Sequence, residues 1–344
     1  MKKQVILFSL FMVILVASFL LNLLLGTVHI PFDSICDILM GNPTDNTVWS
    51  NIILKSRLPQ ALTATMAGAA LSVSGLLMQT VFRNPLADPS VLGVSAGASL
   101  GVAFVVLLSG TLGHIALSSL GYLGELTMSL AAIMGAMMVL MLIVFISAKV
   151  RGNVTLLIMG VMIGYVANAV IGVLKFFSVE EDIRAYVIWG LGSFARVSGD
   201  QVWIFLCLMM ILLPFCFLLI KPLNLLLLGN AYARNLGLNI RRTRFFVILC
   251  AGVLVAVVTA YCGPIMFLGL AVPHLCRGIF CSSDHRVLLP ATILVGSVLA
   301  LLCSLIARLP GLEGALPVNS VTALIGAPVV TWILFRRRRE DTNE

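Results

Sequence analysis

The sequence predicts an all-α polytopic membrane protein. Of its 344 residues, 60% are apolar and only 10% are charged, whereas soluble domains have roughly 25% charged residues. Apolar runs recur that are long enough to cross a hydrocarbon core, which takes about 20 helical residues. The mainly polar intervals between them are too short for an ATPase, protease or kinase domain, so we expect one transmembrane domain over residues 1–344.

The apolar runs predict ten transmembrane helices. The first run, after Met1, is too long for a signal peptide and is interpreted as a retained span. With the N-terminus inside, sixteen of the 22 Lys and Arg residues fall inside and six outside. The positive-inside rule therefore predicts that both termini are cytoplasmic. The predicted spans are 5–25, 61–81, 91–109, 125–147, 154–174, 201–220, 245–262, 265–281, 288–306 and 318–335.

The net charge is +8, and the basic residues are distributed along the chain as a membrane-topology signal would be. The basic excess is expected to face the cytoplasm and the anionic headgroups of membrane lipid. Nothing else supports a nucleic-acid partner. The eight cysteines are scattered, mostly in or beside apolar runs, so they indicate no disulfide framework.

Small residues recur at four-residue spacing, which places them on one face of a helix where neighbouring backbones approach closely. In the second and third spans this spacing predicts ordinary tight packing. The fifth span adds a mid-membrane amide, which must face protein or water. We therefore expect its small face to line a pathway or an interface. The three sets are Ala64, Gly68 and Ser72; Gly93, Gly97 and Gly101; and Gly160, Gly164, Asn168 and Gly172.

Three connecting features have their own predictions. The turn 83–89 contains two prolines, with Asn84 and Asp88 as capping residues. Pro273 should kink the eighth span and leave it short. The segment 175–200 lacks a regular apolar length and is expected to be interfacial or re-entrant, with Trp189 near the lipid headgroups.

No residue pattern predicts catalysis. His274, Cys276, Cys281 and His285 form the one cluster that resembles a metal site, but their spacing spreads them over different helix faces, so we expect no metal. Walker, triad and paired-carboxylate patterns are absent. The spans also lack the buried acidic or lysine side chains of an ion-coupled relay. A transporter of this kind would receive its energy from a partner, and the basic loop 221–244 is the expected point of contact.

Several ordered motifs together resemble the FecCD-type permeases of ABC importers for iron–siderophore complexes, haem and cobalamin. The resemblance covers about residues 50–335. The motifs are Arg57-Leu-Pro-Gln, the small-residue run 68–75, Arg83-Asn-Pro-Leu-Ala-Asp-Pro89, Leu92-Gly-Val-Ser-Ala-Gly97, Trp189-Gly-Leu-Gly-Ser-Phe194, the segment 228–237, Gly263-Pro, Val272-Pro-His274 and Gly326-Ala-Pro328.

The resemblance implies the type II ABC importer permease fold, in the bacterial cytoplasmic (inner) membrane. It implies a second permease subunit, with a homodimer expected, and two cytoplasmic ATPase subunits that bind ATP–Mg. A periplasmic or lipid-anchored binding protein would deliver the ligand. The chain itself would be no enzyme and would bind no cofactor. The expected cargo is an iron chelate, either a siderophore complex or haem, with cobalamin as the alternative.

The resemblance also implies roles for particular residues. The segment Leu228–Leu238 is expected to form a pair of short coupling helices, with Gly229 and Gly237 at the turns and Arg234 offering a charge to the ATPase. The ATPase-coupling set is Leu228, Gly229, Asn230, Ala233, Arg234, Leu236 and Gly237; here Asn230 and Ala231 stand where the family commonly has an acidic residue. Arg57 and Arg308 are expected to dock the binding protein, with Gln60 replacing a second arginine. The cytoplasmic gate is expected at Asn153, Val154 and Thr155, below the small face of the fifth span.

Two other classes stay open from the residues alone. An ion-coupled secondary transporter or channel would need a coupling-ion site in the spans. A membrane-embedded enzyme would need a catalytic cluster at interfacial depth.

Overall fold

The structure is a computed structural model that describes residues 2–26, 28–42, 46–113, 122–150, 152–308 and 316–341. These residues form helices joined by turns, with no strand assigned among them. In chain order the α-helices are α1 (Lys2–Leu24), α2 (Phe32–Met40), α3 (Thr47–Ile52), α4 (Leu58–Phe82), α5 (Val94–Gly113), α6 (Tyr122–Lys149), α7 (Asn153–Phe176), α8 (Glu180–Gly190), α9 (Asp200–Phe217), α10 (Ile220–Leu227), α11 (Asn230–Asn235), α12 (Ile240–Cys262), α13 (Leu268–Phe280), α14 (His285–Ala307) and α15 (Val318–Asp341).

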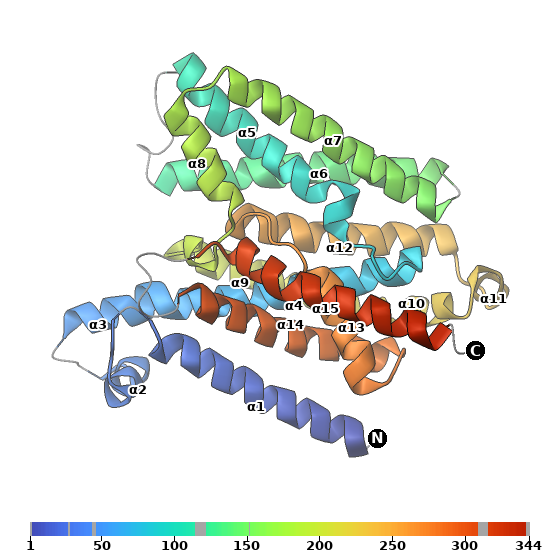
Figure 1. The fold of residues 1–344 in the computed structure, drawn as a ribbon, viewed down its shortest axis with the longest axis horizontal. Coiled ribbons are helices and arrows are strands. Elements are labelled where there is room, and N and C mark those ends of the chain that lie inside the picture. The colour runs from blue at the N-terminus through green and yellow to red at the C-terminus, as the bar shows by residue number, and fades with distance from the viewer. Residues whose placement is uncertain are drawn as a thin grey trace.

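The long helices run roughly along one axis of the molecule (Figure 1). Helices α2, α3 and α8 lie at one end of this bundle. The loop helix α11, the start of α1 and the end of α15 lie at the opposite end. An even number of crossings produces this arrangement. Which end faces the cytoplasm stays a prediction.

The membrane-length helices match the predicted spans in order. Among the described residues, seven helices are long and apolar enough to cross a membrane, and three shorter apolar stretches lie at the predicted third, eighth and tenth spans: Val94–Leu108, Leu268–Phe280 and Val318–Thr331. The shortness predicted for the eighth span is confirmed, because α13 has 13 residues with Pro273 inside it. It is bounded by two left-handed residues, Phe267 and Cys281. The count of ten spans stays a prediction, since α13, with 13 residues, is shorter than a full crossing.

Helix α4 forms the centre of the bundle. Its most apolar window is 83% buried, whereas that of α1 is 6% buried. Close approach explains the small residues on α4: a Cβ added at Gly68 would collide with the carbonyl group of Gly296 on α14, and one at Gly75 with Gly269 on α13. The prediction of ordinary tight packing in the second span is confirmed.

Helices α5 and α6 meet in the same way. A Cβ at Gly97 would lie 2.6 Å from the carbonyl oxygen of Gly135, and one at Gly101 would collide with the carbonyl of Ala131. These contacts let the two backbones approach closely. Packing is therefore the role of this small face, as predicted for the third span.

Polar side chains join α4, α10 and α14 at the end that contains α11. Thr80 Oγ1 lies 2.9 Å from His285 Nε2, and His285 Nδ1 lies 2.7 Å from Asn224 Oδ1. Asn224 Nδ2 donates to Asp284 Oδ1 at 2.6 Å. Because each buried polar group finds a partner in this chain of contacts, the network sets the position of α10 relative to the core.

Two short helices precede α4 where the sequence reading assigned no element. Helix α2 ends at Gly41 in the left-handed conformation, and α3 begins at Asn46, whose side chain accepts from the backbone N–H of Val48. Both are far below membrane length, so the hydropathy pattern used to find spans does not detect them.

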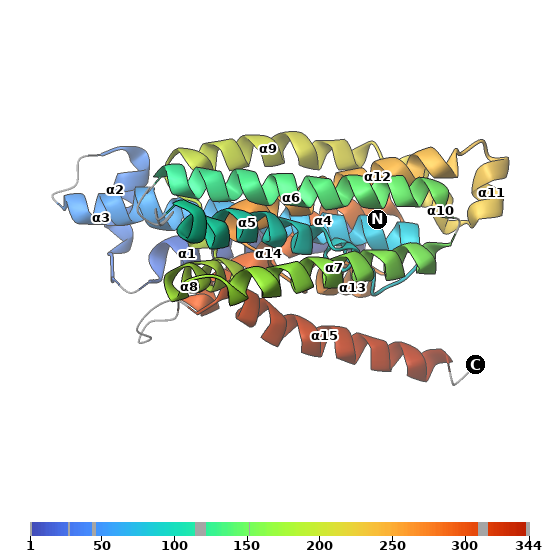
Figure 2. The same ribbon diagram turned by 90° about the horizontal axis from the view of Figure 1, so that it is seen from above.

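One side of the molecule is formed by α7, α8 and α15. Figure 2 shows α15 at the edge of the bundle, on the same side as α7 and α8. Helix α7 has large exposed apolar side chains along its length, including Val154, Tyr165, Val166 and Val173. This surface is named the α7–α15 face below.

Candidate functional site

The loop 221–244 folds as the expected pair of short helices. Gly229, with φ 107°, separates α10 from α11, and Gly237, with φ 84°, ends the turn after α11. Residues other than glycine rarely adopt such angles. Arg83 at the end of α4 donates from Nη2 to the carbonyl oxygen of Leu226 at 2.7 Å, which fastens the end of α10 to the core.

Helix α11 has two different faces. Tyr232 and Leu236 are 69% and 60% exposed, and they lie one turn apart on the outer side of the loop. Ala233 is fully buried and anchors the helix. Arg234 lies on the side roughly opposite Tyr232, because successive helical residues are about 100° apart. There it lines a pocket together with Asn230. The exposed members of the predicted coupling set are Leu228, Asn230, Arg234, Leu236 and Gly237.

Arg57 was predicted as an exposed docking residue, and the structure places it differently. Its side chain is 3% exposed. The guanidinium donates from Nη1 to the carbonyl oxygens of Leu23 and Leu24, at 2.7 and 2.9 Å, and from Nη2 to that of Val28. The end of α1 leaves these carbonyl groups without helical partners, so Arg57 is drawn inward to satisfy them. The expectation that Arg57 lies on the outer surface is therefore wrong in this conformation.

Arg308 is half-buried beside Arg57. Its Nη2 donates to Asn22 Oδ1 at 2.6 Å and its Nε to the carbonyl oxygen of Ser304 at 3.4 Å. Burial, and in second place the Arg57 guanidinium, lowers the pKa of Arg308 to about 10. Gln60, one turn after Arg57, is buried and lies 3.5 Å from Ser304 Oγ. Two guanidinium groups thus meet at the end of the bundle opposite α11, and no ion pair with a carboxylate is recorded for either within the described ranges.

The small face of α7 divides into two parts. A Cβ at Gly160 would lie 2.7 Å from Cα of Leu92, and Gly164 lies beside Gly93, so this half packs inside the chain. Asn168 and Gly172 are exposed on the α7–α15 face. A four-residue spacing rotates by about 40° per step, which moves the later residues out of the internal contact. The expectation of one continuous lining surface is therefore corrected for Gly160 and Gly164.

The residues predicted as a gate lie at the start of α7. Val154 and Thr155 are exposed at the end of the bundle that contains α11. Asn153 is the first residue of α7, and its side chain falls outside the described part of the chain.

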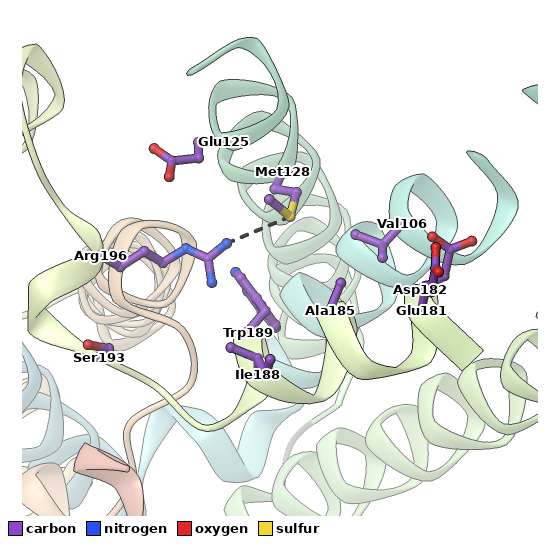
Figure 3. Close-up of a pocket in the computed structure, with 10 residues that line it drawn as sticks. All are labelled: Val106, Glu125, Met128, Glu181, Asp182, Ala185, Ile188, Trp189, Ser193 and Arg196. Carbon is purple, nitrogen blue, oxygen red and sulfur yellow. Dashed lines mark hydrogen bonds between the residues drawn. The ribbon is translucent and has the colours of Figure 1, made fainter. Parts of the chain in front are cut away.

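A cavity of about 350 Å³ lies behind α8, at the other end of the bundle (Figure 3). Glu181 and Asp182 lie at one side of it and Arg196 at the other, with Trp189 between them. Arg196 lies over the Trp189 ring, 6.0 Å from its centroid, and burial lowers the pKa of this arginine while Glu125 opposes the change. Burial, and in second place Glu181, raises the pKa of Asp182.

Trp189 was expected near the lipid headgroups, and this expectation is wrong. The side chain is 1% exposed and packs on Tyr186. Its Nε1 has no hydrogen-bond partner among the described residues. Tryptophan occurs both at membrane interfaces and in protein cores, beside short apolar segments in each case. The local sequence around Trp189 therefore does not distinguish the two environments.

The four residues that resemble a metal site in the sequence are dispersed by the fold. Cys276 is buried in α13, while Cys281 is exposed at its end. His274 Nδ1 lies 2.9 Å from the carbonyl oxygen of Leu270, and His285 belongs to the network with Thr80 and Asn224. These side chains serve local packing and hydrogen bonding.

Two sets of contacts that position the loop 221–244 were not predicted: Arg83 with Leu226, and Asn224 with His285 and Asp284. Each joins residues more than fifty positions apart. An Arg, Asn or His at a helix end signals only that some carbonyl or polar partner is required.

Comparison with known proteins agrees with the motifs and the fold. Residues 14–336 match the FecCD transport family. The vitamin B12 import system permease protein BtuC of Klebsiella pneumoniae subsp. pneumoniae is 38% identical over 287 residues, which is 83% of this chain and 83% of that protein. BtuC of Escherichia coli O9:H4 is also 38% identical, over 284 residues that cover 82% of this chain and 83% of that protein.

The fold has a solved counterpart. A structure described as an inward-facing conformation of a metal-chelate type ABC transporter matches with a TM-score of 0.82 at 28% identity, covering 96% of this chain and 99% of that one. The relatives and the membrane-length helices place the chain in the bacterial inner membrane as a multi-pass protein. The chain belongs to the FecCD transport family and is a permease subunit of an ABC importer.

Proposed function

We propose that this permease imports a metal chelate, with an iron chelate (a siderophore complex or haem) as the first candidate cargo. The observation that favours a metal chelate is the whole-chain match to a metal-chelate type transporter, at a TM-score of 0.82. Cobalamin is the second candidate, and the 38% identity to vitamin B12 permeases favours it. Both cargoes are large, so the pathway must be wider than one helix bundle provides.

A second copy of the chain supplies the other half of this pathway. The α7–α15 face is the part of the surface that supports the proposal, since Asn168 exposes an amide there beside large apolar side chains. A polar group at mid-membrane depth must face protein or water. Two such faces, one from each subunit, would enclose a channel with Asn168 and Gly172 along it and Val154 and Thr155 at its inner gate.

ATPase subunits supply the energy, and they hold the ATP–Mg. We assign the docking surface to the outer side of α10 and α11, where Leu228, Tyr232 and Leu236 are exposed. Exposed apolar side chains on a short, well-anchored helix suit insertion into a cleft of a partner. Gly229 and Gly237 allow the turns that bound this helix, and the buried Ala233 anchors it, so that the helix can transmit a displacement.

The binding protein docks at the opposite end. Arg308 supports this assignment because its half-buried guanidinium lies beside the buried Arg57, and a carboxylate from a partner would offset the repulsion between the two charges. Arg308 is the more accessible of the two and makes the first contact. Such contacts mainly set orientation and encounter rate.

The cargo is tested in proteoliposomes that contain the permease with its own ATPase subunits and receive the cognate binding protein. Uptake is measured for a labelled ferric siderophore, for haem and for cobalamin, with and without ATP. We expect ATP-dependent uptake of an iron chelate. Uptake of cobalamin alone would transfer the assignment to the second candidate.

The same assay tests the other transport class. Uptake that continues without the ATPase subunits and follows an imposed proton or sodium gradient would contradict the ABC mechanism and favour an ion-coupled transporter.

A further inference from the structure

A pocket of about 670 Å³ lies at the end of the bundle that contains α11. Three elements that are distant in sequence form it: the end of α6, the inner side of α11 and the first turns of α12. The pocket is named the basic pocket, and its charged lining residues are Lys149, Arg234, Arg241 and Arg244.

The charged residues named above as lining the basic pocket are all cationic. Its four cationic residues come from three helices, and no Asp or Glu lines it within the part of the chain that the structure describes. Arg241 and Arg244 also lie in the first turns of α12, where the helix dipole disfavours positive charge. An anion between these side chains would offset their mutual repulsion.

The surroundings of the pocket indicate which anion fits. One helical turn from Lys149 lies Phe145, which is exposed, and the Lys149 Nζ sits 4.4 Å from the centre of its ring. One turn from Arg241 lies Phe245, which is also exposed. Each of these two cations therefore gives way, over about 6 Å along its helix, to an exposed aromatic side chain. This order of charge and then apolar surface matches a phospholipid, with its phosphate outside its acyl chains.

We propose that the basic pocket binds the phosphate headgroup of an anionic phospholipid. Arg and Lys donate charge-assisted hydrogen bonds to the phosphate oxygens, and the acyl chains lie along Phe145 and Phe245. Because Arg234 belongs to α11, the bound lipid joins the loop helix to α6 and α12. Lipid binding itself needs no ATPase. Only its effect on coupling rests on the role proposed for α11.

The test compares two variants that remove the same charge. Lys149→Gln/Arg241→Gln loses two cations of the basic pocket. Arg242→Gln/Arg286→Gln loses two exposed cations, one of which directly follows Arg241 in the sequence, and neither lines the pocket. The full-length permease is purified without partners, placed in mixed micelles with phosphatidylglycerol or phosphatidylcholine, and analysed by native mass spectrometry for retained lipid.

We expect the unmodified permease to retain phosphatidylglycerol in preference to phosphatidylcholine. Loss of two charge-assisted contacts should weaken phosphatidylglycerol binding at least about tenfold in Lys149→Gln/Arg241→Gln, and the control pair should stay within about twofold. Equal loss in both pairs, or equal retention of the two lipids, would overturn the proposal. Thermal unfolding in neutral detergent shows whether each variant is folded, and Lys149→Gln alone replaces the double variant if that one is not.

Two further measurements distinguish a phospholipid from other occupants of the basic pocket. Inorganic phosphate in excess should not displace phosphatidylglycerol, whereas displacement would make the pocket a site for a free anion. If Lys149→Gln/Arg241→Gln reduces ATPase co-purification and leaves lipid retention unchanged, the pocket belongs to a carboxylate of the ATPase and the lipid proposal fails. Failure of lipid binding leaves the docking role of Tyr232 and Leu236 untouched, since that role is measured with the ATPase present.

Discussion

Single polar side chains determine how the loop 221–244 is fastened to the bundle. Asp284 caps α14 by accepting from the backbone N–H of Arg286 at 2.8 Å, and it also accepts from Asn224 of α10. Asn224 in turn contacts His285, which reaches Thr80 of the central helix. One carboxylate therefore stabilises a helix start and an inter-helix connection.

Replacing Asp284 should show this role as a pH dependence. The hydrogen bond from Arg286, first among several causes, holds the pKa of Asp284 below its usual value of 3.8. An acid with a lowered folded pKa stabilises the fold above its unfolded pKa, and this contribution disappears as pH falls through the folded pKa. We expect Asp284→Ala to lower unfolding stability by about 1 kcal/mol at pH 7, as for other N-caps.

The stability gap between the unmodified protein and Asp284→Ala should narrow below about pH 4, where the carboxylate becomes protonated. Thermal unfolding in detergent at several pH values measures it. Asp33→Ala, at an acidic residue in the first turn of α2, is the comparison. A gap that stays constant down to pH 3 would show that the ionised carboxylate is not what stabilises this contact.

At the scale of elements, local patterns predict which segments are helical and tertiary packing decides what their faces do. The sequence indicated a short helix pair in the loop 221–244, and α10 and α11 confirm it. It treated Arg234 as the charge offered to the ATPase, and the fold turns that side chain toward α6 and α12. The docking surface proposed for α11 consequently consists of apolar side chains.

Truncation of this apolar surface should release the ATPase. We expect Tyr232→Ala/Leu236→Ala to reduce co-purification of the ATPase at least about tenfold, since central interface anchors each contribute roughly 1–2 kcal/mol. The control is Phe32→Ala/Met40→Ala, which shortens two exposed apolar side chains on α2, at the other end of the bundle. Equal ATPase recovery from both variants would place the docking surface elsewhere.

At the scale of the whole molecule, the α7–α15 face is the surface on which the proposed channel depends. Helix α15 lies at the edge of the bundle, and α7 is exposed along much of its length (Figure 2). Two copies that associate through this face would bury both helices. The helices of the core, α4 and α12, would remain inside each subunit.

Added bulk on this face should weaken the dimer. We expect Val166→Trp/Val173→Trp to raise the dimer dissociation constant at least about tenfold, because two large side chains, at exposed positions seven residues apart, hold the subunits away from each other. The control is Leu130→Trp/Met134→Trp on the exposed side of α6. Mass photometry of the solubilised permease measures the monomer fraction, and a fully dimeric Val166→Trp/Val173→Trp would refute this interface.

The sequence by itself determined the class, the order of the membrane-length helices and the family. These properties follow from information that is local in the chain: apolar length, helix-breaking residues such as Pro273, glycines such as Gly229, and ordered motifs. The tight packing at Gly68 and Gly97 was also predictable, because the four-residue spacing of small residues has a physical meaning in any helix pair.

The tertiary structure alone decided which way individual side chains face. Arg57 turns inward because the last two residues of α1 and Val28 beyond it present carbonyl groups to it, and Trp189 is covered because α8 folds back over α5 and α6. Gly160 packs on Leu92 while Gly172 lies open, although both belong to one helix. The physical reason is that burial and hydrogen-bond partners come from segments far away in the sequence, which no local pattern specifies.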